Sequence, residues 1–100
     1  MRILLVGAGG VGDAIAKVAA GRDFFELMVV SDYEQTKAEA TINWIRNRYG
    51  REVAARFTPA KLDASSAANV TEICREYEIT HVINAVEPRF VPTIFSGTFT

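Results

Sequence analysis

The sequence predicts an α/β domain built on a parallel sheet, and three observations carry that prediction. Short apolar runs alternate with longer amphipathic stretches along the chain. The first run ends at a glycine-rich turn that opens a helical pattern, and an aspartate closes the second run. Alternating units of this kind favour parallel strands joined by right-handed crossovers. The expected fold class is therefore a Rossmann-like, doubly wound parallel sheet, with residues 1–100 as one dinucleotide-binding domain.

The first strand and helix are expected within the first twenty or so residues. Residues 3–6 form a continuous apolar run, which suits a strand covered on both faces. Val11, Ile15 and Val18 follow at helical spacing, which predicts a helix with these three residues along one side. Gly21 is a suitable stop for that helix.

The second unit repeats this arrangement. Residues 27–30 form another buried apolar run, which ends at Ser31 and Asp32. An apolar stripe at spacings of four, three and four predicts a helix from about residue 34 to residue 49. Gly50 follows it, where a helix C-terminus favours glycine.

The second half of the sequence predicts two more strands and a further helix. Residues 51–57 alternate apolar and charged side chains and are predicted as a third, more polar strand, and Pro59 indicates that this strand has ended. Residues 64–77 predict a helix and residues 81–86 a fourth strand, after which Pro92 could start another helix. The order is β-α-β-α-β-α-β. Since a complete dinucleotide fold has about six strands, we expect a chain truncated before its second half, the front part of a longer two-domain protein.

Composition narrows the classes of partner. Eleven basic and twelve acidic residues give a net charge of −1, which gives no reason to expect nucleic acid or an anionic membrane as a partner. The apolar runs are far shorter than the roughly 20 residues that span a bilayer. No secretory signal is visible, so a cytoplasmic location is expected. One cysteine and one histidine leave no basis for a disulfide framework or a metal site.

The glycine-rich turn is the central candidate site. A Gly-x-Gly-x-x-Gly pattern has weight only between a strand and a helix, which is its context here. Gly7 permits the tight turn, Gly9 lets a diphosphate approach the backbone, and Gly12 lets the helix pack closely. Free N–H groups and the dipole at the helix start favour an anion there. The predicted cofactor-binding segment is Gly7, Ala8, Gly9, Gly10, Val11 and Gly12.

Asp32 is the second element of the predicted site. It lies about 20 residues after Gly12, where a carboxylate accepts hydrogen bonds from the adenosine ribose and repels a 2′-phosphate. No Arg or Lys follows it until Lys37. The expected cofactor is therefore NAD, with NADP less favoured. The alternative makes Asp32 the N-cap of the helix that begins near Glu34, and the two roles are compatible.

Four further residues complete the candidate site. Asp63 follows the third strand, where it could meet the adenine amine or cap the next helix. Tyr33 could cover the adenine, or it could simply be a solvated side chain. Asn84 and Ala85 close the fourth strand, where small residues would let the middle of the cofactor lie against the backbone. Asn84 could equally satisfy a neighbouring loop.

Four segments together resemble the amino-terminal part of the saccharopine dehydrogenase family. They are residues 3–12, Val30-Ser31-Asp32, Leu62-Asp63 and the stretch from Val82 to Pro88. The last of these is the most particular to the family. The resemblance implies a Rossmann domain joined to a substrate domain, and reversible oxidation of secondary amines formed from an amino acid or polyamine, with NAD or NADP.

The resemblance also assigns roles to residues. It implies that Gly7, Gly9, Gly12 and Asp32 bind the nucleotide, with Asp63 and the Asn84–Ala85 pair nearby, and it implies no catalytic residue in this chain. Many relatives carry an arginine just after the position of Asp32. Tyr33 departs from that pattern, which disfavours NADP.

The leading functional hypothesis is the cofactor-binding part of an oxidoreductase that transfers hydride to or from a secondary amine or imine. Such a chain is not expected to turn over alone. The predicted partners are the dinucleotide and, in the complete protein, an amino-acid-derived substrate, while self-association into a homo-oligomer stays open. The alternative is a regulatory nucleotide-sensing module of the kind that gates potassium transport.

Overall fold

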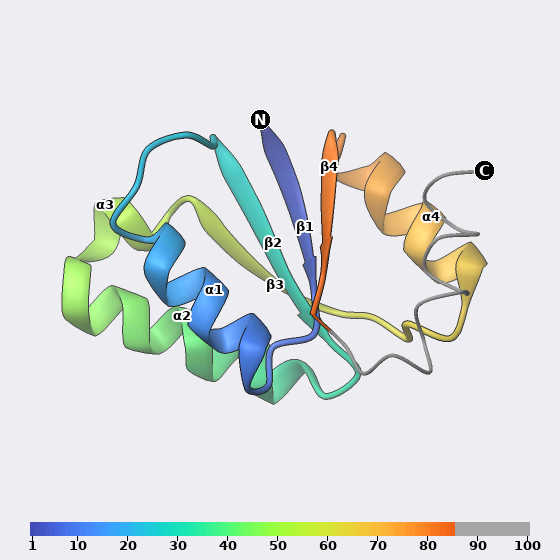
Figure 1. Cartoon of the computed structure of the whole chain (residues 1–100), viewed down its shortest axis with the longest axis horizontal. Coiled ribbons are helices and arrows are strands. Elements are labelled where there is room, and N and C mark those ends of the chain that lie inside the picture. Colours follow the sequence, from blue (N-terminus) through green and yellow to red (C-terminus); the bar gives the residue numbers. More distant parts are fainter. Residues whose placement is uncertain (86–100) are drawn as a thin grey trace.

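The computed structural model describes residues 1–85, and its centre is a four-stranded sheet (Figure 1). The strands are β1 (Arg2–Val6), β2 (Leu27–Asp32), β3 (Phe57–Lys61) and β4 (His81–Asn84). Their order in the sheet is β3-β2-β1-β4, and every neighbouring pair is parallel. This is the order of the first four strands of a doubly wound dinucleotide fold, so the predicted fold class is confirmed.

Helices cover both faces of the sheet. They are α1 (Val11–Ala19), α2 (Gln35–Tyr49), the short α3 (Arg51–Ala54) and α4 (Ala67–Glu76). Figure 1 shows α1 and α2 on one side and α4 on the other. Each side has its own apolar cluster, and alternate strand residues contribute to each, as with Leu5 on the α1 side and Leu4 on the α4 side. Burial on both faces explains why β1 and β2 are continuous apolar runs.

The buried side of α1 differs from the predicted stripe. Val11 and Val18 are 65% and 64% exposed, whereas Gly12, Ala16 and Ala19 face the core. The strands opposite already fill the interface with large side chains, so only small residues allow the helix to lie close to the sheet. Val11, Ile15 and Val18 do share one flank of α1, but only Ile15 of the three packs against the core, and it does so while partly buried.

Enlarging one alanine of α1 tests this packing. We expect Ala16→Leu to lower the free energy of unfolding by about 1–3 kcal/mol, because Ala16 is fully buried against the sheet. Ala14→Leu is the matched control on the exposed side of the same helix, and we expect a change within about 0.5 kcal/mol. Urea denaturation followed by circular dichroism measures both. Equal losses would contradict the assigned packing face.

The predicted third strand was misplaced. Residues 51–54 form α3, and β3 runs from Phe57 to Lys61, so the predicted strand over residues 51–57 is wrong. Alternation of apolar and charged residues over so short a stretch also fits one helical turn, in which only Ala54 is buried.

Pro59 lies inside β3 and does not end it. The N–H of Met28 donates to the carbonyl of Arg56 at 2.8 Å, and the N–H of Leu62 donates to the carbonyl of Asp32 at 2.9 Å. The backbone groups of even-numbered β3 residues therefore face β2, and those of Pro59 face outward. On this outer strand of the described sheet, proline loses no ladder hydrogen bond.

The remaining elements fall close to their predicted bounds. Gly50, with φ of 97°, ends α2 as expected. α4 starts three residues later than predicted because Ser66 is its N-cap and accepts a hydrogen bond from the Asn69 N–H. The predicted fourth strand is present as β4, while Val86 and the helix predicted from Pro92 lie outside the described residues. No helix in the described range is long and apolar enough to cross a bilayer.

Candidate functional site

The glycine-rich turn connects β1 to α1 at the carboxyl edge of the sheet. Gly7 has φ of 100°, a conformation that side chains disfavour, and its N–H donates to the carbonyl of Ser31 at 2.8 Å. Gly10 is the N-cap of α1, and its carbonyl accepts from the Ala14 N–H at 3.1 Å. The extra glycine therefore occupies the junction between turn and helix, a role that the spacing alone did not indicate.

Gly12 is required by a close approach of backbone to backbone. A Cβ at Gly12 would lie 1.6 Å from the carbonyl oxygen of Gly7 and 3.4 Å from the Cβ of Ala85. The absence of a side chain thus lets the first turn of α1 lie directly on the end of β1.

The start of α1 presents amides that can receive an anion. Among the described residues, no side chain caps this helix. The first amides of a helix have no partner within the helix, although the Gly12 N–H here donates to the Gly9 carbonyl at 3.2 Å. The helix dipole adds to the attraction of this end for negative charge. The turn and the helix start together form a cradle whose chemistry fits a diphosphate.

Asp32 ties this turn to the next helix. Its Oδ2 accepts a hydrogen bond from the Ala8 N–H at 2.8 Å, and its Oδ1 accepts one from the Glu34 N–H at 2.9 Å. The N-cap of α2 is Glu34, not Asp32, so the capping alternative is wrong in its simple form. A carboxylate offers about four acceptor positions, so Asp32 can accept hydrogen bonds from about two further donors.

Asp63 lies just beyond β3 and holds a local turn. Its Oδ1 accepts from the Ser65 hydroxyl at 2.5 Å and from the Ser65 N–H at 2.9 Å. These hydrogen bonds hold the pKa of the Asp63 carboxyl below its usual value. Because Ser66 is the N-cap of α4, the predicted capping role of Asp63 is wrong. Asp32, the last residue of β2, is in register with Lys61, which places Asp63 two residues beyond the paired ends of the two strands.

Asn84 and Ala85 bring the end of β4 to the glycine-rich turn. Asn84 is in register with Val6, and the Ala85 N–H donates to the Val6 carbonyl at 2.8 Å. The predicted site residues from β1, β2 and β4 therefore meet at one edge of the sheet, with Asp63 beside them.

Lys61 also lies at this edge, although the sequence did not point to it. It is in register with Asp32, and its Nζ lies 5.7 Å from the ring centroid of Tyr33, which is 66% exposed. Along the chain the first cation after Asp32 is Lys37, and the predicted third strand ended before residue 61. With β3 placed at its true position, the pairing of β2 and β3 would have identified Lys61.

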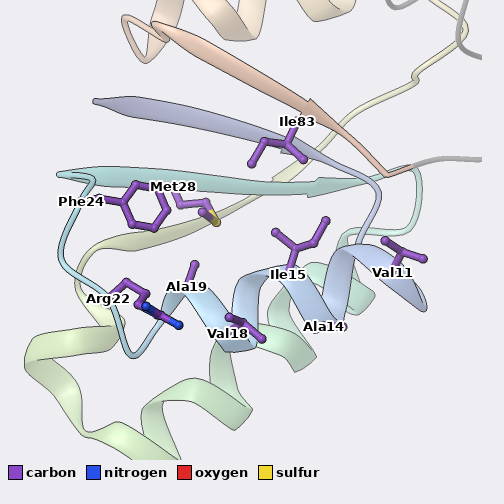
Figure 2. Close-up of a pocket in the computed structure, with 9 residues that line it drawn as sticks. All are labelled: Val11, Ala14, Ile15, Val18, Ala19, Arg22, Phe24, Met28 and Ile83. Carbon is purple, nitrogen blue, oxygen red and sulfur yellow. The ribbon is translucent and has the colours of Figure 1, made fainter.

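A hollow of about 550 Å³ lies elsewhere, on the flank of α1 that faces β4 (Figure 2). It is lined almost wholly by apolar side chains, chiefly Val11, Ile15, Val18, Phe24, Met28 and Ile83. Figure 2 shows Ile15 pointing from α1 toward the sheet and Arg22 beyond the end of the helix. Neither a carboxylate nor a glycine backbone lines this hollow, so it does not have the chemistry of a dinucleotide site.

Several solved structures share this fold. Menthone neomenthol reductase from Mentha piperita superposes with a TM-score of 0.71 at 15% identity, over 85% of this chain and 31% of that one. Quinate dehydrogenase from Corynebacterium glutamicum, in complex with NAD, gives a TM-score of 0.63 at 26% identity, over 85% of this chain and 26% of that one. Saccharopine dehydrogenase (L-Glu forming) from Saccharomyces cerevisiae gives a TM-score of 0.68 at 17% identity, over 96% of this chain and 19% of that one. The chain spans about a third or less of the length of each.

No match is found among curated proteins. A family model does match, however, over residues 3–96, and it is described as the saccharopine dehydrogenase NADP binding domain. The match includes the glycine-rich turn, Asp32, Asp63 and the end of β4. This chain is therefore a member of the saccharopine dehydrogenase NADP-binding domain family.

Proposed function

We propose that the chain is the cofactor-binding part of an oxidoreductase, in which the turn over residues 7–12 receives the diphosphate and Asp32 holds the adenosine ribose. The observation that carries this proposal is the hydrogen bond from the Ala8 N–H to Asp32 Oδ2. It holds the proposed ribose-binding carboxylate against the proposed phosphate-binding turn. The distance between these two contacts is therefore fixed before the cofactor binds. Such preorganisation lowers the entropy lost on binding.

The other residues of this edge have supporting roles in the proposal. Tyr33 and Asp63 flank the adenine, and Asn84 and Ala85 line the path toward the nicotinamide. When bound, the dinucleotide supplies the hydride donor or acceptor, and the protein orients it. The proposed substrate is a secondary amine or imine derived from an amino acid, bound by the complete protein. The family match supports this oxidoreductase over the regulatory sensor, which would use the same turn and aspartate.

The proposal includes a preference for NADH over NADPH. The carboxylate of Asp32 accepts from free ribose hydroxyls, whereas a 2′-phosphate would bring like charge against it. The family description names NADP, and a comparison of the two cofactors on this chain tests the preference.

Asp32→Ala tests the ribose contact. We expect NADH affinity to fall at least tenfold, since the loss of even one hydrogen bond to a charged group costs about 1.5 kcal/mol or more. NADPH affinity should fall less, because the substitution also removes a repulsion. Titration calorimetry with both cofactors measures the difference. Asp23→Ala removes an exposed aspartate of the loop between α1 and β2 and serves as the matched control.

The comparison between cofactors separates the two roles of Asp32. Loss of the Ala8 hydrogen bond would loosen the turn and weaken both cofactors alike. An equal loss for NADH and NADPH would therefore reduce Asp32 to a support of the turn and contradict the ribose assignment.

A further inference from the structure

Lys61 stands beside Asp32 on the same face of the sheet. The two residues are register partners at the ends of β3 and β2. Side chains alternate along strands, and the earlier pair in the same register, Met28 and Phe57, lies in the cluster on the α1 side. Asp32 lies four residues after Met28 and Lys61 four after Phe57, so both side chains point to that side too. A cation therefore lies next to the proposed ribose site.

The charge of Lys61 is not neutralised within residues 1–85. No carboxylate of the described residues lies within ion-pair distance of its Nζ, which rests instead near the ring of the exposed Tyr33. Its register partner, Asp32, directs its two oxygens to the N–H groups of Ala8 and Glu34. An exposed ammonium thus remains available to an anion at the ribose edge.

We propose that Lys61, supported by Tyr33, forms a subsite for a phosphate on the 2′ position of the adenosine ribose. This inference rests on the proposed function, because it requires the ribose to lie at Asp32. A lysine binds phosphate as a point charge, without the two-pronged geometry of arginine. Asp32 then repels this phosphate, and Lys61 attracts it. Lys61 sets how far the chain accepts NADPH beside NADH.

Lys61→Met removes the charge and keeps most of the aliphatic chain. We expect NADPH affinity to fall about tenfold and NADH affinity to stay within about twofold, as measured by titration calorimetry on the whole chain. Lys61→Arg should restore NADPH binding. Because the attraction is between exposed charges, raising the salt concentration should weaken NADPH binding more than NADH binding in the unsubstituted chain.

Two further variants test whether a different cation accounts for NADPH binding. Arg75→Met, in the last turn of α4, removes one exposed positive charge from another element of the fold and should change neither affinity. Lys37→Met removes the cation of α2 that pairs with Glu34 at 3.8 Å. A loss of NADPH binding in Lys37→Met but not in Lys61→Met would overturn the assignment of Lys61.

The outcomes also separate this inference from the proposed function. If both cofactors bind and Lys61→Met weakens neither, or weakens both equally, the 2′-phosphate subsite is wrong while the nucleotide site stands. If neither cofactor gives heat with the unsubstituted chain, the proposed function fails and the role of Lys61 fails with it.

Discussion

Gly12→Ala is expected to lower the free energy of unfolding by about 3 kcal/mol or more. The new Cβ would lie 1.6 Å from the carbonyl oxygen and 2.7 Å from the carbonyl carbon of Gly7. Both atoms belong to the backbone, so no side-chain rotation relieves the overlap, and either α1 or the end of β1 must move. A loss of this size is a large part of the total stability of a small domain.

Urea denaturation followed by circular dichroism measures this loss. Gly21→Ala is the matched control, because a Cβ there would meet its nearest neighbour, the Tyr49 hydroxyl, at an ordinary 3.7 Å. We expect that variant to be as stable as the unsubstituted chain or slightly more so, since alanine restricts the unfolded chain. Equal stability of the two variants would show that α1 does not lie on the end of β1 as described.

The parts of the fold that could be predicted are those in which sequence period and burial agree. Residues 3–6 and 27–30 are apolar without interruption because each strand is covered on both faces. Gly50 marks the end of α2 because its backbone conformation favours glycine. That the candidate site residues lie close together could be predicted as well, since the carboxyl ends of parallel strands meet at one edge.

The features that escaped prediction depend on which elements are neighbours in space. Ala16 is buried in place of Val18 because the space beneath α1 is set by the strands opposite, which the helix sequence does not reveal. Pro59 fits inside β3 because that strand pairs on one side only in the described sheet. Lys61 lies beside Asp32 through the pairing of β3 with β2, although the two residues are far apart along the chain.

Gly9→Ala is expected to leave the fold intact and to remove most of the nucleotide affinity. A Cβ at Gly9 would have nothing within 4 Å, and Gly9 is not among the glycines with positive φ. Nothing in the described structure therefore requires glycine at this position. If a diphosphate lies against the turn, the added methyl group occupies its place, and we expect affinity for both cofactors to fall about a hundredfold.

The fold thus requires glycine at position 12, whereas only a bound ligand would require it at position 9. Gly12 is demanded by the contact of α1 with Gly7, whereas open space around Gly9 has a use only if something approaches the backbone there. Calorimetry with NADH and NADPH, beside urea denaturation of the same Gly9→Ala sample, tests the distinction. Stability within about 0.5 kcal/mol of the unsubstituted chain, together with unchanged cofactor binding, would mean that the diphosphate does not rest on this turn.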